Sequence, residues 1–304
     1  MLSRVAETLY WTARYVERAE NIARLVNVNS LFLMDVPKEA SPGWEPLLDI
    51  IGARDAFFEI YQVASEKNVI KFLTVEKRNP SSIRNCISAA RSNMRTVRDV
   101  VPKEVWEIVN KLDLEIDATS NDFLTKRGQS KSLEKVVKHC LLTLGAMEAT
   151  MSHDDGFYFW RIGSLIERAD MTSRIIDVRS AIEKDDDYLL PFKNIQWTSV
   201  LHSLSAYQMY RQRMGVRVRP NDVLDFVIYD ERFPRSIYWC LNEIKRNLVK
   251  LPRSENLMLR VEHSISEIDE SDVKEIVTVS LANFIDELQI DFADIHNTLA
   301  EQYF

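Results

Sequence analysis

The chain has 304 residues, of which 46% are hydrophobic and 28% are charged, and its formal net charge is −7. This composition is typical of a globular protein with a substantial buried core. The excess of negative charge argues against a nucleic-acid-binding protein, which usually presents a basic surface. The sequence contains no run of about 18 or more uncharged apolar residues, so we expect no membrane span and no membrane partner.

Glycine and cysteine are both scarce. Seven glycines in 304 residues favour long helices, because glycine destabilises a helix interior by about 1 kcal/mol. The three cysteines, Cys86, Cys140 and Cys240, are widely spaced and form no CxxC pair. This usage is typical of reduced, buried thiols in a cytoplasmic protein. The N-terminal segment MLSRVAETLYWTARYVERAE carries charges throughout and lacks the apolar stretch of a signal peptide.

Apolar residues recur every three or four positions along most of the chain, as they do in amphipathic helices. In chain order, this spacing predicts helices over residues 2–33, 45–63, 67–76, 82–99, 103–124, 131–153, 157–183, 196–213, 221–229, 235–250, 255–267 and 271–301. Two Pro-x-Ser segments, residues 80–82 and 234–236, predict helix starts at which the serine binds the backbone. The expected fold class is therefore all-α.

A charged helical phrase occurs twice, as RYVERAENIAR in residues 14–24 and as SLIERADMTSR in residues 164–174. The matching positions, 150 residues apart, are Glu17, Arg18, Ala19, Glu20 and Arg24 in the first copy and Glu167, Arg168, Ala169, Asp170 and Arg174 in the second. The register continues at an offset of 153 with Trp44 and Trp197, and at 154 with Cys86 and Cys240. It predicts two homologous helical bundles, residues 1–153 and 154–304, packed as one body around paired E-R helices.

Long motifs also resemble a known family from end to end. They include LYWTARYVERAENIARL, MEATMSHDDGFYFWRIGSLIERADMTSRIID, SLSAYQMYR and VIYDERFPRSIYWCL. They resemble the alpha-E family, α-helical bacterial proteins named for an E-R motif. The resemblance implies partnership with a circularly permuted ATP-grasp protein and a transglutaminase-like peptidase, and a role in peptide or amide-bond modification. The chain departs from the family at His153, where many relatives have arginine.

The E-R helices carry the first group of candidate site residues. On the first helix these are Arg14, Glu17, Arg18, Glu20, Asn21 and Arg24, and on the second they are Glu167, Arg168, Asp170 and Arg174. Spacings of three and four place most of them along one stripe of each helix. One interpretation is a buried Glu–Arg network that fixes the register of the two helices. Another is a polar pocket in which arginines hold a carboxylate or phosphate and a glutamate accepts a proton.

Two further groups contain chemically active residue types. His153 and Asp154 stand at a helix break, where they could act catalytically or interact with the helix end. Tyr207 and Arg211 begin the most basic stretch of the chain, which could bind an anion or lie in solvent. The chain has no HExxH, no Glu-x-x-His pair, no P-loop and no GxSxG, so we expect neither a metal nor a cofactor.

These patterns favour a non-ATPase component of a peptide or amide-bond modification system. It would bind a ligase partner or an acidic or amidated peptide through the duplicated Glu–Arg site. The alternatives are an enzyme with Glu17 or Glu167 as general base and arginines as anchors, and a scaffold whose charged pairs only hold the fold. The sequence leaves the reaction, the substrate and the oligomeric state open.

Overall fold

The computed structural model describes residues 2–37, 41–185, 193–273, 276 and 281–304, which are predominantly helical. No strand occurs in these ranges, and the predicted all-α class is confirmed. Within them, no helix has both the length and the apolar character needed to cross a bilayer. The chain divides into two compact units, and each unit draws residues from both predicted halves. Unit 1 comprises Met1–Asn27, Ala53–Glu167 and Gln302–Phe304, and unit 2 comprises Val28–Gly52 and Arg168–Glu301.

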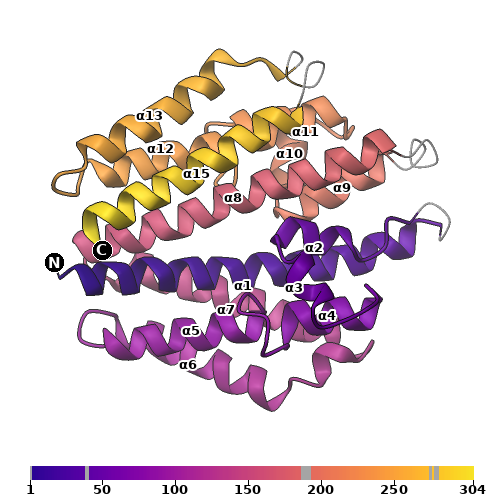
Figure 1. Ribbon diagram of the computed structural model, residues 1–304, viewed down its shortest axis with the longest axis horizontal. Coiled ribbons are helices and arrows are strands. Elements are labelled where there is room, and N and C mark those ends of the chain that lie inside the picture. Colours follow the sequence, from indigo (N-terminus) through magenta and orange to yellow (C-terminus); the bar gives the residue numbers. More distant parts are fainter. Residues whose placement is uncertain (1, 38–40, 186–192, 274–275, 277–280) are drawn as a thin grey trace. The chain divides into compact units, whose positions relative to one another are not determined.

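Two long helices, α1 (Ser3–Asp35) and α8 (Asp155–Asp185), contribute residues to both units. The other helices of unit 1 are α3 (Arg54–Phe58), α4 (Glu66–Thr74), α5 (Ile83–Thr96), α6 (Lys103–Ala118), the 3-10 helix η2 (Asp122–Leu124) and α7 (Gln129–Thr150). Helix α6 packs against both α5 and α7 (Figure 1). The short helix η2 packs against both α4 and α7. The core between these helices includes the fully buried side chains of Phe57, Phe72 and Cys86.

Unit 2 contains α2 (Pro46–Ile51), α9 (Lys193–Ser203), α10 (Tyr207–Met214), α11 (Pro220–Tyr229), α12 (Ile237–Leu248), α13 (Glu255–Glu270) and α15 (Leu281–Tyr303) up to Glu301. Helix α12 packs against α11 and α13, while α9, α10 and α11 contact one another. Trp197, Tyr210 and Cys240 are among the buried side chains of this unit.

Serine caps begin two helices at the positions that the Pro-x-Ser segments predict. The Ser82 hydroxyl accepts a hydrogen bond from the Asn85 amide at the start of α5, and the Ser236 hydroxyl accepts one from the Trp239 amide at the start of α12. Each cap satisfies a backbone donor that the helix itself leaves without a partner. These contacts confirm both predicted helix starts.

Three predicted helices are divided or shortened by local backbone conformations. The predicted helix 45–63 is two short helices, because Gly52 adopts a left-handed conformation with φ of 66° and ends α2. The predicted helix 196–213 breaks at Ser205, where φ is 53° and the next amide donates to the carbonyl of Leu201. The predicted helix 103–124 ends at Ala118.

The final predicted helix, 271–301, corresponds in part to α15, which begins at Leu281. Residues 274–275 and 277–280 of that prediction lie outside the described residues.

Several features recur at the offsets that the duplication predicts. Cys86 and Cys240 are both fully buried, Trp44 and Trp197 are both buried, and Ser82 and Ser236 are both caps. These correspondences support the duplication, which we retain as a proposal.

The backbones of α1 and α8 approach each other closely within unit 1 at Gly163. A Cβ atom at this position would lie 2.4 Å from the carbonyl oxygen of Tyr10 on α1. Since no side chain can occupy that space, the glycine allows a backbone separation that any other residue would prevent. By contrast, a Cβ atom at Gly145, an exposed position in α7, would meet nothing within 4 Å.

We predict opposite effects for the two glycine-to-alanine substitutions. Gly163→Ala should lower the free energy of unfolding by about 2 kcal/mol or more, because it forces the two helices apart. Gly145→Ala should raise it by about 0.5–1 kcal/mol through its higher helix propensity. Urea denaturation of both variants measures the effects, and a neutral or stabilising Gly163→Ala would contradict the close approach.

Candidate functional site

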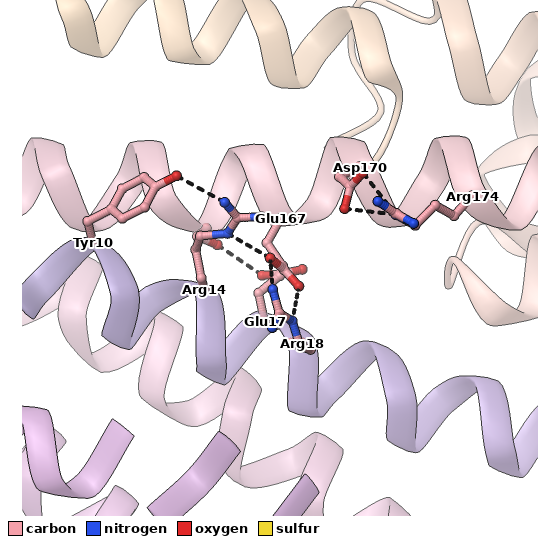
Figure 2. A network of polar contacts seen from close by, with 8 residues as sticks. Tyr10, Arg14, Glu17, Arg18, Glu167, Asp170 and Arg174 are labelled. Atoms are coloured by element: carbon pink, nitrogen blue, oxygen red, sulfur yellow. Dashed lines mark hydrogen bonds and ion pairs between the residues drawn. The ribbon is translucent and has the colours of Figure 1, made fainter. Parts of the chain in front are cut away.

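The candidate site is centred on Glu167 of α8, whose carboxylate is 2% exposed and is held by two arginines of α1 (Figure 2). Arg14 donates from Nε to Glu167 Oε2 at 2.7 Å. Arg18 donates from Nε to Oε1 at 2.5 Å and from Nη2 to Oε2 at 2.9 Å, which is a bidentate arrangement. Both carboxylate oxygens are therefore occupied by charge-assisted hydrogen bonds.

In a second contact between the same helices, α8 supplies the donor and α1 supplies the carboxylate. The Ser164 hydroxyl of α8 donates to Oε2 of the fully buried Glu17 of α1 at 2.9 Å. Arg14 and Ser164 are 150 residues apart, as are Glu17 and Glu167. Arg14 of the first copy binds Glu167 of the second copy, and Ser164 of the second copy binds Glu17 of the first. Reciprocal contacts of this kind are typical of a two-fold interface. This exchange supports the proposed duplication.

The surroundings of the network shift the ionisation of its members. Burial raises the pKa of Glu167, but the Arg18 and Arg14 guanidinium groups outweigh burial and lower it to about 2. Burial lowers the pKa of Arg14, but the Glu167 carboxylate outweighs this effect and raises it above its ordinary value. Tyr10 accepts a hydrogen bond from Arg14 Nη1 at 3.1 Å, and burial raises the pKa of its phenol. The Glu167 carboxylate and the Arg14 guanidinium therefore stay ionised at neutral pH.

The remaining residues of the two charged stripes form separate pairs along their own helices. In unit 1, Arg24 Nε donates to Oε1 of the fully buried Glu20 at 2.5 Å. In unit 2, Arg174 Nε contacts both oxygens of Asp170 at 2.9 and 3.0 Å (Figure 2). Asn21 is also buried. The two ion pairs have the same i,i+4 spacing and occupy equivalent positions in the two copies of the phrase.

Arg168, the arginine of the second copy, makes a different contact from Arg18. Its Nη1 donates to the carbonyl oxygen of Pro234, just before α12, at 3.1 Å. Thr172, one turn along α8, donates its hydroxyl to the carbonyl oxygen of Arg235 at 3.1 Å. Both contacts tie α8 to the start of α12 within unit 2.

His153 and Asp154 immediately precede α8. One oxygen of Asp154 accepts hydrogen bonds from the amides of Gly156 and Phe157 at 2.9 and 3.3 Å, which is the geometry of a helix N-cap. The exposed His153 ring stacks on Phe157 with centroids 3.8 Å apart, and its Nε2 lies 3.4 Å from the carbonyl oxygen of Glu148 in the last turn of α7. These contacts favour the interpretation that both residues stabilise helix ends.

Tyr207 and Arg211 lie on α10 in unit 2. The Arg211 guanidinium stands 5.6 Å from the Tyr207 ring, which also stacks on His202 at 4.6 Å. Neither residue belongs to the Glu167 network.

Sequence patterns did not reveal a second buried arginine. Arg179 of α8 is 2% exposed, and its Nη2 donates to Asn29 Oδ1 of α1 at 3.2 Å. Burial lowers its pKa to about 10. Asn29 and Arg179 are 150 residues apart and thus occupy equivalent positions. The shared offset of 150 residues is the sequence signal from which the contact between Asn29 and Arg179 could have been predicted.

Comparison with known proteins identifies the family. The sequence matches the Alpha-E family, described as a predicted alpha-helical domain with a conserved ER motif, over residues 1–304. The chain belongs to the Alpha-E family. The Alpha-E chain is also similar to the uncharacterized protein Mb2597 of Mycobacterium bovis and to the uncharacterized proteins MT2643 and Rv2567 of Mycobacterium tuberculosis. Each is 23% identical over 98% of this chain, which spans 36% of the relative's length. No solved structure matches.

The geometry gives the E-R motif of this Alpha-E chain a physical explanation. Consecutive residues on a helix point in directions about 100° apart, so the Glu and Arg of one motif do not face each other. Instead, Arg18 of the first motif binds Glu167 of the second motif on the other helix. In this chain the motif is therefore a link between α1 and α8.

We predict that Glu167→Gln lowers the free energy of unfolding at pH 7 by about 3 kcal/mol, because the buried Arg14 and the partly exposed Arg18 lose their counter-charge. In the wild type, the contribution of Glu167 to stability follows from its pKa, which is near 4.5 in the unfolded chain and about 2 in the folded chain. A lowered pKa stabilises the fold above pH 4.5, and this stabilisation disappears as the pH falls towards 2. The difference between variant and wild type should therefore shrink across that window.

Urea denaturation at stepwise lower pH measures this difference. Glu134→Gln, at an exposed position on α7, is the matched control and should change stability by less than about 0.5 kcal/mol throughout. A Glu167→Gln effect that stayed constant from pH 7 to pH 2 would show that the network is not the source of the stabilisation.

Proposed function

We propose that this Alpha-E domain is a non-ATPase component of a peptide or amide-bond modification system and acts by binding a partner. The partner that the family resemblance suggests is a circularly permuted ATP-grasp ligase, with a transglutaminase-like peptidase in the same system. The mycobacterial relatives support a partnership, since the region matched by this chain is 36% of each of those longer proteins. In them, the region matched by this chain is joined to further sequence.

The distribution of charge in the E-R helices carries the binding part of the proposal. In unit 1 the carboxylates lie inside, with Glu167 at 2% and Glu20 at 0% exposure. The arginines that hold them reach the surface, since the Arg18 and Arg24 side chains are 22% and 19% exposed. In unit 2, the Arg174 side chain is 33% exposed while it holds Asp170. Guanidinium groups that are fixed on one side by a carboxylate present a preorganised cationic edge to an acidic peptide segment.

The enzyme alternative receives less support from the same geometry. A general base must accept a proton at neutral pH and needs a lone pair directed at the substrate. Glu167 has a pKa of about 2, and both of its oxygens already accept hydrogen bonds. We therefore propose that the network fixes the position of α1 against α8 within unit 1. The solvent-exposed parts of its arginines would then recognise the partner.

We predict that the charge-preserving changes Arg18→Lys and Arg168→Lys weaken binding to the ATP-grasp partner by about tenfold or more. Lysine keeps the charge but loses the planar, bidentate donor set. Co-purification at low salt, followed by biolayer interferometry with the purified ligase, measures the affinity. Arg95→Lys, at an exposed position in the last turn of α5, is the matched control and should bind as the wild type does.

Thermal melting of each variant separates binding from folding. If Arg168→Lys lowers the melting temperature and leaves the affinity unchanged, the motif only holds the fold and the scaffold alternative is correct. Repeated failure of the wild-type domain to co-purify with the ligase at low salt would overturn the proposed partnership.

A further inference from the structure

Unit 2 contains a cavity of about 490 Å³ between α10, α11 and the segment that follows α11. Its volume lies in the range of small-molecule sites, which is about 300–1,000 Å³. Phe226 and Phe233, whose rings stack at 4.8 Å, form an apolar wall together with Met209. Asp230 and Arg213 supply charged groups to the same cavity.

The carboxylate of Asp230 is only partly satisfied. Its Oδ1 accepts hydrogen bonds from the amides of Arg232 and Phe233, both at 2.8 Å. Its Oδ2 is buried and has no hydrogen-bond donor among the described residues. Arg213 forms an ion pair with this oxygen at 2.9 Å, but its N–H is not aligned for a hydrogen bond, and its side chain is 54% exposed. A buried acceptor without a donor is uncommon in folded proteins and indicates a place for a ligand group.

The corresponding place in unit 1 shows what chemistry fits there. At the offset of 154 that the duplication predicts, Asp230 matches Glu76 and Phe226 matches Phe72. In unit 1, the Tyr61 phenol donates to Glu76 at 2.7 Å, and its ring packs edge-on against Phe72 at 6.4 Å. An aromatic ring with a hydrogen-bond donor thus fills the space beside the acid. In unit 2, the oxygen of Asp230 that the amides leave over meets Arg213, and both residues line the cavity.

We propose that the cavity of unit 2 binds a free α-amino acid with an aromatic side chain. The ligand ammonium donates to Asp230 Oδ2, and the ligand carboxylate pairs with Arg213. Because the ion-paired atoms of Asp230 and Arg213 are 2.9 Å apart, they match an ammonium and a carboxylate carried by one carbon atom. The ring of the ligand packs against Phe226 and Phe233, as Tyr61 packs against Phe72 in unit 1.

Isothermal titration calorimetry with L-phenylalanine tests this proposal. Three probes each remove one recognised group: N-acetyl-L-phenylalanine lacks the ammonium, phenethylamine lacks the carboxylate, and glycine lacks the ring. Each probe should bind at least about tenfold more weakly than L-phenylalanine. No detectable binding of L-phenylalanine at about 10 mM, or equal binding of the acetylated probe, would overturn the proposal.

Two variants locate the binding in the cavity. Asp230→Asn keeps an oxygen for the amides of Arg232 and Phe233 but loses the charge, and it should weaken binding about tenfold or more. Met209→Trp, at a position that is 48% exposed, should fill the cavity and abolish binding without disturbing the core. The second variant keeps the test decisive if Asp230→Asn folds poorly.

Matched controls lie outside the cavity. Glu76→Gln changes the corresponding acid of unit 1, and Arg211→Gln changes a neighbouring arginine of α10. Both should bind L-phenylalanine as the wild type does, and equal loss in these controls would place the binding elsewhere and refute the site. Arg18→Lys should also leave this binding unchanged, so a failure here is distinguishable from a failure of the proposed partnership.

Discussion

The buried carboxylate of Glu167 is the constraint on which the structure of unit 1 depends. An ionised carboxylate removed from water destabilises a fold by several kcal/mol unless opposite charges and hydrogen bonds surround it. Arg14 and Arg18 lie one helical turn apart on α1, and that spacing allows both guanidinium groups to bind one carboxylate. Any sliding of α1 along α8 would separate them from it. The ion network therefore specifies the register of the two helices.

Close backbone packing reinforces the same register. Gly163 precedes Glu167 by one turn of α8, and its missing side chain leaves room for the carbonyl oxygen of Tyr10. Tyr10 in turn precedes Arg14 by one turn of α1 and accepts a hydrogen bond from it. The steric contact and the ionic contact are thus one turn apart on both helices. Only one relative position of the helices satisfies both.

Local sequence patterns predicted the helices better than they predicted the contacts between them. Three- and four-residue periodicity and the Pro-x-Ser segments carry information within a few residues, so α5 and α12 begin where expected. The left-handed conformation of Ser205 could not be predicted, because serine rarely adopts it. The N-cap role of Asp154 could have been predicted from its position directly before a helix. An acidic residue beside a histidine also suggests catalysis, so the sequence left both interpretations open.

The charged stripe was visible in the sequence, and a Glu–Arg network between the two helices was one interpretation of it. The spacing did not show that Arg14 and Arg18 bind the same carboxylate, because that partner is about 150 residues away in the sequence. The divergence between the copies also matters. Glu167 receives two arginines, while Glu17 receives the hydroxyl of Ser164, because the position of Arg14 is a serine in the second copy. The proposed duplication accounts for the equivalent positions, and the difference between Arg14 and Ser164 decides which carboxylate carries the ionic network.

Two acid–arginine sites in this chain differ in how completely they are closed. Glu167 has both oxygens hydrogen-bonded and lies among side chains that are themselves largely buried. Asp230 has one oxygen bound by two amides and another that meets an exposed arginine at the edge of a cavity. Opening the first site would leave buried charges unpaired, so its contribution is to stability and register. At the second site, the ion pair between Asp230 and Arg213 can be replaced by two ion pairs with a zwitterionic ligand. Because such a ligand carries no net charge, its binding does not change the net charge of the interior.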